Sequence, residues 1–273
     1  MPASDSGSGA DAAIAMVATS SPRLPDAARI LAACDATAAS PARKRGLFGA
    51  LFGRMSSTAA AKLWKDGNLV TELRGGHLAV SLMPAPIPWR DLEGPCATAW
   101  WWPEATEQMR SHRYHFLVAL IRGDIERVER RVLLTHVVRA VVSTTDAIGV
   151  YWGEGTLVHE PRMFLEQSAR IAPDHIPGML WIDVRVEPNA DKSFRCFTTG
   201  LAPLGFLEIE VARSLLKPQD LIELIGDTAC YIVNGRKRIK DGETMGRTET
   251  ERYKVRHVPS MFGRGKVMRL LMQ

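Results

Sequence analysis

The sequence predicts an α+β fold with a mixed, mostly antiparallel sheet or sheets and helices packed on them. Strand-like runs occur in neighbouring pairs, as at 68–73 and 77–83, where Gly75 and Gly76 suit a tight turn. Strands and helices also do not alternate regularly along the chain, which disfavours a doubly wound parallel sheet. The chain has 273 residues, 46% of them hydrophobic, which is enough to bury a core without disulfides.

The individual elements follow from hydrophobic patterning. Apolar or alternating runs predict strands at 13–19, 68–73, 77–83, 114–121, 147–152, 179–186, 194–199, 206–211, 252–258 and 266–271. Helical periodicity predicts helices over 26–34, 104–110, 125–144, 162–171 and 219–233. Proline suits the first turn of a helix, and Asp124 is the expected cap of helix 125–144. The three alternating prolines between Met83 and Trp89 predict an extended crossover.

Composition suggests the domain organisation. Residues 1–12 are small and polar, so we expect a disordered N-terminus. Residues 13–273 are expected to form one α+β domain, in which a boundary between two subdomains is allowed near 145–175. A flexible basic linker or insertion, rich in Ala, Ser and Gly, is expected to interrupt this domain at 35–62.

The net charge of +5 is unevenly distributed. Residues 43–62 carry a net +5 and residues 235–273 a net +7, whereas residues 63–234 carry a net −5. The basic C-terminal segment has only Tyr253 and Phe262 as aromatic residues, so nucleic-acid binding is disfavoured. No run approaches the roughly 20 apolar residues of a transmembrane segment, and no secretory signal is evident. We therefore expect a cytoplasmic location.

One basic segment also carries apolar side chains. Arg43, Lys44 and Arg45 precede Phe48 and Phe52 in the stretch GLFGALFG. Basic residues beside apolar ones are typical of a helix that binds a membrane surface. Three glycines in eight residues weaken that helix, so binding to a membrane surface or polyanion remains an alternative to a linker role.

A few residues could support catalysis. His112 and His115 form an HxxH pattern, and Glu154 and Glu160 follow the buried strand 147–152, so an enzyme with a His/Glu site is one alternative. Serine-hydrolase, nucleotide-binding and zinc-protease motifs are lacking, which favours a protein that is not an enzyme. The four cysteines are far apart, so we expect buried free thiols and neither a metal nor a cofactor.

A glycine-rich turn followed by two acids is the clearest binding motif. Gly200, Leu201 and Gly205 permit a tight reversal of the chain, and Glu208 and Glu210 fall on one face of the following strand. Two acids on one face form either a solvent face or a patch for a basic partner. We therefore name these five residues as the candidate binding site.

Several stretches in a consistent order carry a family resemblance. They are MPAPIPW at 83–89, the passage WPEA…SHRYHFLVAL at 102–120, YWGEGTLVHEP at 151–161, the Gly200 motif and the final strands. Together they resemble the bacterial domain-of-unknown-function family 4261 over 13–33 and 63–271. That resemblance implies a bacterial protein, and because the family has no assigned activity it supplies no catalytic residues.

The turn TTGLxxxGxxEIE is also similar to a motif of suppressor-of-fused-like domains. Some bacterial members of that group are thought to act as immunity proteins against toxins. With the missing catalytic motifs, this resemblance implies a non-enzymatic protein-binding module of an immunity-like or adaptor-like kind, with another protein as its partner.

Overall fold

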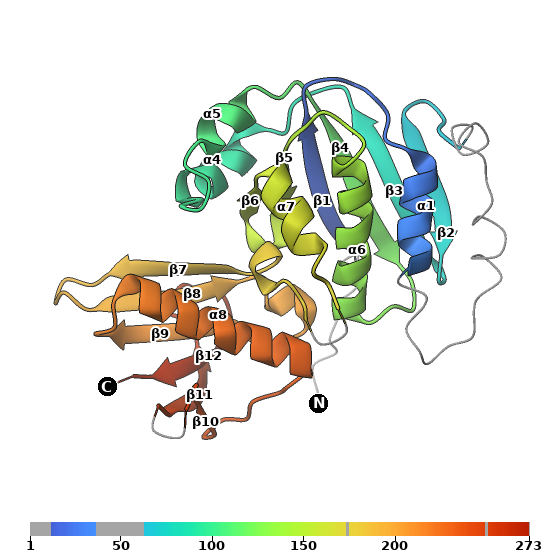
Figure 1. Cartoon of the computed structure of the whole chain (residues 1–273). Coiled ribbons are helices and arrows are strands. Elements are labelled where there is room, and N and C mark those ends of the chain that lie inside the picture. The colour runs from blue at the N-terminus through green and yellow to red at the C-terminus, as the bar shows by residue number, and fades with distance from the viewer. Residues whose placement is uncertain (1–11, 37–62, 173–174, 249–250, 273) are drawn as a thin grey trace. The chain divides into compact units, whose positions relative to one another are not determined.

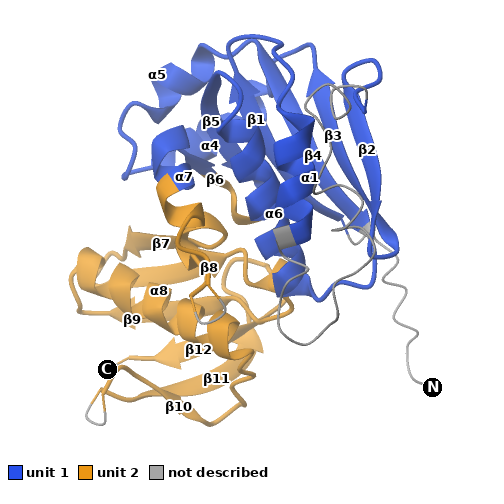
Figure 2. Cartoon of the chain, turned by 45° about the vertical axis from the view of Figure 1, so that its right-hand side comes forward, with its two compact units in different colours: residues 1–153, 158–165 blue, residues 154–157, 166–273 orange. Residues whose placement is uncertain are grey.

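The computed structural model describes residues 12–36, 63–172, 175–248 and 251–272. The chain divides into two compact units, one formed by 1–153 and 158–165 and the other by 154–157 and 166–273 (Figure 2). Each unit contains one six-stranded sheet, and most strand pairs are antiparallel. The predicted α+β class is confirmed. The basic segment with Arg43, Lys44, Arg45, Phe48 and Phe52 lies outside the described residues.

The sheet of the first unit has the strand order β2-β3-β4-β1-β5-β6. The strands are β1 (Ala12–Thr19), β2 (Asn68–Leu73), β3 (Gly76–Met83), β4 (Tyr114–Arg122), β5 (Ala147–Trp152) and β6 (Leu157–His159). The hairpin β2–β3 forms around Gly75, whose φ of 74° is readily adopted only by glycine. Strand β1 lies inside the sheet between β4 and β5, and every second residue from Ala13 to Val17 is buried.

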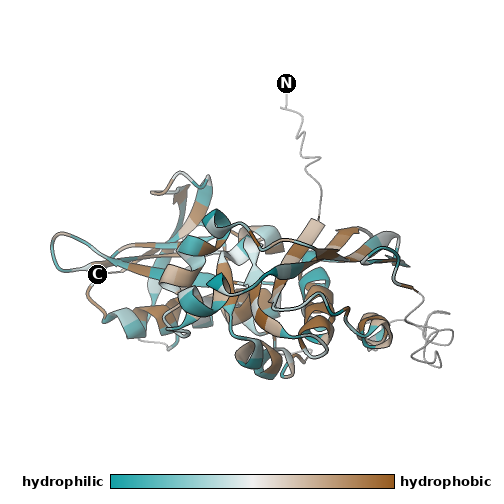
Figure 3. Ribbon diagram, turned by 90° about the horizontal axis from the view of Figure 1, so that it is seen from above, coloured by the Kyte–Doolittle hydropathy of each residue, from teal (hydrophilic) through white to brown (hydrophobic). Residues whose placement is uncertain are grey.

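The helices of this unit pack on the sheet (Figure 1). They are α1 (Ala27–Ala36), α4 (Trp89–Thr98), α5 (Ala105–Arg110), α6 (Arg127–Val142) and the start of α7 (Pro161–Ser168). Helices α1 and α6 contact each other, and α6 also contacts β1 and β4. Helices α4 and α5 close a separate apolar cluster around Trp102 and Met109. Figure 3 shows hydrophobic and hydrophilic segments interleaved along strands and helices, as amphipathic elements require.

The sheet of the second unit has the order β10-β11-β12-β9-β8-β7. Its strands are β7 (Asp183–Pro188), β8 (Phe194–Thr199), β9 (Ile209–Ser214), β10 (Thr244–Met245), β11 (Tyr253–Pro259) and β12 (Lys266–Leu271). Strand β12 lies parallel to β9, and the other pairs are antiparallel. Helix α8 (Pro218–Gly235) lies along one face of this sheet and buries Leu221, Leu224 and Ile225 (Figure 1).

Several predicted boundaries differ from the structure. Strand β1 begins at Ala12 and α1 continues to Ala36, two residues into the expected insertion. Glu126 caps α6 in place of Asp124, because its carboxylate accepts the backbone N–H groups of Val128 and Glu129. Strand β9 begins three residues later than predicted, since 206–208 still belong to the turn. The predicted strand 179–186 is a 3-10 turn at Gly178–Leu180 followed by β7.

Candidate functional site

One face of the second sheet carries a row of arginines. Cross-strand partners place Arg185 beside Phe197, Phe197 beside Glu210, Glu210 beside Arg269 and Arg269 beside Arg256. Paired residues on neighbouring strands point to the same face of a sheet. These five residues therefore cross β7, β8, β9, β12 and β11 on a single face, which we call the arginine face.

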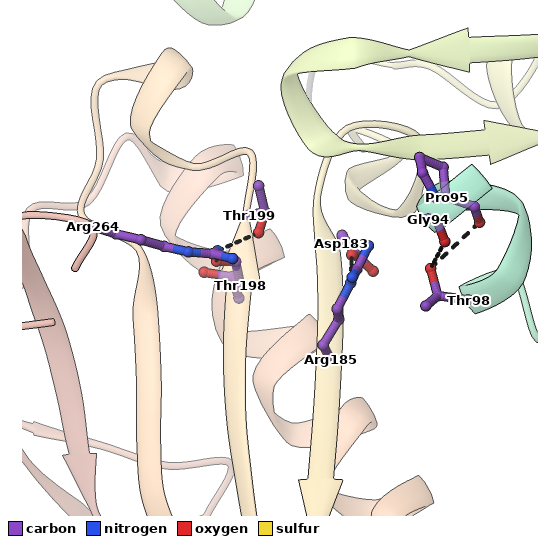
Figure 4. A network of polar contacts seen from close by, with 8 residues as sticks. All are labelled: Gly94, Pro95, Thr98, Asp183, Arg185, Thr198, Thr199 and Arg264. Carbon is purple, nitrogen blue, oxygen red and sulfur yellow. Dashed lines mark hydrogen bonds and ion pairs between the residues drawn. The ribbon is translucent and has the colours of Figure 1, made fainter. Parts of the chain in front are cut away.

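The loop 260–265 packs on this face. The ring of Phe262 lies 4.4 Å from that of Phe197, and the Arg264 guanidinium stacks 4.7 Å from the Phe197 centroid. Arg264 Nη1 donates to the backbone oxygen of Thr198 at 3.2 Å and to Thr199 Oγ1 at 2.5 Å (Figure 4). The Arg264 side chain is thus exposed but fixed by two hydrogen bonds and an aromatic ring.

Glu210 connects the loop to the sheet. Its carboxylate is 1% exposed and accepts a hydrogen bond from Ser260 Oγ at 2.5 Å and one from the Met261 N–H at 3.2 Å. Arg269 Nη2 donates to the same carboxylate at 2.9 Å. If these contacts broke, a buried carboxylate would be left without partners, which is energetically costly. The contacts therefore hold Ser260 and Met261, at the start of the loop, against β9.

Glu208 organises the turn that precedes β9. Its carboxylate accepts hydrogen bonds from Thr198 Oγ1 at 2.6 Å and from the backbone N–H groups of Gly200 and Ala202, both at 2.9 Å. Thr198 Oγ1 accepts in turn from the Ile209 N–H at 2.8 Å. One buried side chain therefore supplies acceptors that the backbone of the turn otherwise lacks.

The glycines of this motif are required by geometry. Gly200 has a φ of +120°, and a Cβ there would overlap the carbonyl oxygen of Trp181. Gly205 has a φ of +87° and ends the 3-10 helix Ala202–Leu204. Leu201 is fully buried. Only glycine adopts these two conformations without strain.

The five residues of the motif are thus brought together, but Glu208 and Glu210 do not form the exposed face that the spacing allowed. Both carboxylates are buried because the turn and the loop 260–265 fold over them. Sequence reasoning missed Phe262 and Arg264 as site residues. The available signal was one arginine on each of four strands, namely Arg185, Arg195, Arg256 and Arg269. These arginines can be assigned to one face only once the strand order is known.

The rim of the arginine face carries ion pairs. Arg185 Nε lies 2.5 Å from Asp183 Oδ2, and Arg195 Nη2 lies 2.6 Å from Glu187 Oε2 (Figure 4 shows the first pair). Burial raises the pKa of Asp183, while Arg185 and Arg264 act in the opposite direction. Arg185 and Arg195 are therefore largely neutralised within the chain.

Residues 197–271 match the model of a family described as a domain of unknown function (DUF4261). The predicted resemblance to this family is confirmed over these residues, and its extension to 13–33 and 63–196 stays a prediction. The DUF4261 stretch contains Gly200, Glu208, Glu210 and the whole loop 260–265, so the turn and the loop on the arginine face both belong to it. Comparison with curated proteins and with solved structures gave no match. The similarity to suppressor-of-fused-like domains stays a prediction.

The HxxH histidines lie outside the DUF4261 stretch, in the first unit. The Ile87 N–H donates to His112 Nε2 at 2.7 Å, so the ring proton of His112 lies on Nδ1, which bonds the Met109 carbonyl oxygen. His115 Nδ1 donates to the Ala85 oxygen at 2.8 Å. Burial lowers the pKa of both imidazoles. The two histidines hold the proline-rich segment 83–89 in place.

The two glutamates of the predicted catalytic set belong to different units. Glu160 precedes α7, and its backbone oxygen accepts the Phe164 N–H at 2.9 Å. Glu154 lies in the 3-10 turn Gly153–Gly155 and belongs to the second unit. Among the described residues, no group of three or more His, Cys, Asp or Glu side chains could hold a metal ion. Within the same residues, no helix is long and apolar enough to cross a membrane.

The remaining contacts in Figure 4 belong to the first unit. Thr98 Oγ1 donates to the backbone oxygen of Gly94 at 2.9 Å and to that of Pro95 at 3.4 Å. These bonds satisfy carbonyl groups at the end of α4. This helix was not predicted, because Gly94 and Pro95 interrupt its helical pattern.

Proposed function

We propose that this chain is a cytoplasmic bacterial protein-binding module without enzymatic activity, immunity-like or adaptor-like, and that the arginine face is its binding surface. The observation that carries the proposal is the exposed Arg264, fixed over Phe197 and Phe262. Arginine and aromatic side chains are enriched at the centres of protein interfaces. A side chain that is already held in place also loses less entropy on binding.

The motif residues support this surface from beneath. Glu210 fixes the loop that carries Phe262 and Arg264, and Glu208 fixes the turn that follows Thr199. Gly200, Leu201 and Gly205 shape that turn. In this proposal the five predicted binding residues position the surface, while the loop 260–265 makes the contact.

The use of the histidines favours binding over catalysis. His112 and His115 each bond a backbone group of the segment 83–89. A general base must reach a proton on a substrate, and both ring nitrogens of His112 already bond backbone groups of the protein, as does Nδ1 of His115. The proposal therefore assigns both residues a structural role.

Quantitative affinity capture with the full chain tests the proposal. We expect a protein recovered in stoichiometric amount with the wild-type chain and lost with Phe262→Ala and Arg264→Ala. Arg213→Ala is the matched control, because Arg213 is also an exposed arginine but pairs with Asp191 in the turn between β7 and β8. Circular dichroism confirms that each variant is folded. A partner retained equally by all variants, or none at all, would contradict the proposal.

A further inference from the structure

We infer that Arg264 binds an Asp or Glu side chain of an acidic partner protein through the edge of its guanidinium formed by Nε and Nη2. This inference rests on the proposed function and specifies the partner. The two side-by-side N–H groups of that edge match the two oxygens of a carboxylate.

The hydrogen bonds of Arg264 leave that edge available. A guanidinium has five N–H donors on three nitrogens. Both hydrogen bonds from Arg264 start from Nη1, and a face of the group is stacked on Phe197. Among the described residues, neither Nε nor Nη2 of Arg264 has an acceptor, and the side chain is exposed. The contacts within the chain therefore hold the group while leaving its recognition edge open.

The other arginines on this face are already paired. Arg185 is paired with Asp183, Arg269 with Glu210, and Arg256 with Asp241. Arg264 has no ion pair among the described residues. Its charge also attracts Asp183, but that carboxylate is already hydrogen-bonded to Arg185, so an incoming carboxylate meets less competition at Arg264 than at the paired arginines.

The surroundings favour an acidic partner. Lys254 lies on the same face, because it pairs with Leu271 two residues beyond Arg269. The segment 235–273, which supplies β11, β12 and the loop, carries a net charge of +7. Such a surface attracts acidic proteins and repels basic ones.

The same face is poorly suited to nucleic acid. Binding of single strands relies on exposed aromatic rings that stack on bases. Phe197 is 5% exposed, and Phe262 packs against it. The chemistry therefore favours a protein carboxylate over a nucleic-acid phosphate.

Fluorescence anisotropy with a labelled peptide of alternating Glu and Ala residues tests the inference. We expect the wild-type chain to bind this peptide, and Arg264→Lys, which keeps the charge but removes the two-donor edge, to weaken binding about tenfold or more. Arg213→Lys should leave binding unchanged. A peptide with Gln in place of Glu should bind much more weakly.

Four results would overturn the inference. The first three are equal binding by Arg264→Lys and wild type, equal binding of the Glu and Gln peptides, and Arg264-dependent binding of oligothymidine that is tighter than that of the Glu peptide. A dimer that sedimentation velocity finds in the wild type but not in Arg264→Lys would also overturn it, because a second copy would then occupy the face.

The peptide and capture experiments separate the inference from the proposed function. If a captured partner needs Arg264 but the acidic peptide does not bind, the arginine face is supported as the binding surface, and the inference that Arg264 binds a carboxylate is refuted. If the peptide binds through Arg264 but no partner is captured, the inference that Arg264 binds a carboxylate is supported, and the proposed protein-binding function is refuted.

Discussion

Replacing Glu208 with alanine should destabilise the second unit by about 3–5 kcal/mol. The substitution removes the acceptor for two backbone N–H groups, those of Gly200 and Ala202, and for the Thr198 hydroxyl. Each buried donor left without an acceptor costs about 1–3 kcal/mol, and the hydroxyl can rotate to another acceptor. The unpaired buried amide of Gly200, the partly exposed amide of Ala202 and the lost packing of the side chain together account for the expected range.

Hydrogen exchange and urea unfolding together measure this effect. In Glu208→Ala, the amides of Gly200 and Ala202 should exchange at least about a hundredfold faster, since 1.4 kcal/mol corresponds to a factor of ten. Glu208→Gln keeps an oxygen that can accept from both amides, so we expect a smaller loss of about 1–2 kcal/mol. This milder variant keeps the test informative if the alanine variant does not fold.

Glu223→Ala is the control for this prediction. Glu223 lies exposed on α8, and among the described residues its carboxylate accepts a hydrogen bond from Gln219 alone. We expect its unfolding midpoint to stay close to that of the wild type. Equal stability and equal amide exchange in the Glu208 and Glu223 variants would show that Glu208 does not hold the turn.

Three further outcomes are expected. Burial lowers the folded-state pKa of His112, His115 and His136, the last of which lies on α6. The unfolded chain therefore binds more protons than the folded chain below about pH 6.5, and the urea midpoint should fall as the pH drops from 7.5 to 5.5. A constant or rising midpoint would contradict this. Gly200→Ala should cost at least about 3 kcal/mol of stability in thermal unfolding, because its Cβ would overlap Trp181, and an unchanged melting temperature would be inconsistent with the turn. The native thiols should react far more slowly with Ellman's reagent than those of the urea-unfolded chain. Burial raises the pKa of Cys34 and Cys196 to about 12 and that of Cys96 to about 11, so little reactive thiolate is present. Rapid reaction of three or more thiols in the native chain would contradict this.

Local patterns were sufficient to predict most of the elements. The hairpin β2–β3 and the strand β4 follow from alternating or continuous apolar runs, and Pro218 marks the first residue of α8. Helix α4 was missed because Gly94 and Pro95 both disfavour helix, while burial of Leu92 and Cys96 in an apolar cluster outweighs that preference. Tertiary packing decides such cases, and a local pattern does not reveal it.

The site was only partly predictable for the same reason. The spacing predicts that Glu208 and Glu210 share one strand, but β9 begins at Ile209, so Glu208 lies in the turn before it. The burial of Glu210 depends on Ser260 and Met261, about fifty residues further along the chain. The arginine face depends on β12 lying parallel to β9, and no turn signal specifies that pairing. Phe262 and Arg264 can therefore be assigned to the arginine face only when the strand order is known.

The binding surface itself is tested most directly by a hydrogen-exchange footprint of the full chain with and without its captured partner. We expect slower exchange in the partner complex at residues 197–199 and 260–265, with Arg264→Lys abolishing that protection and Arg213→Lys preserving it. Protection confined to α8 or to the first unit, with none in the loop that carries Phe262 and Arg264, would contradict the assignment of the arginine face.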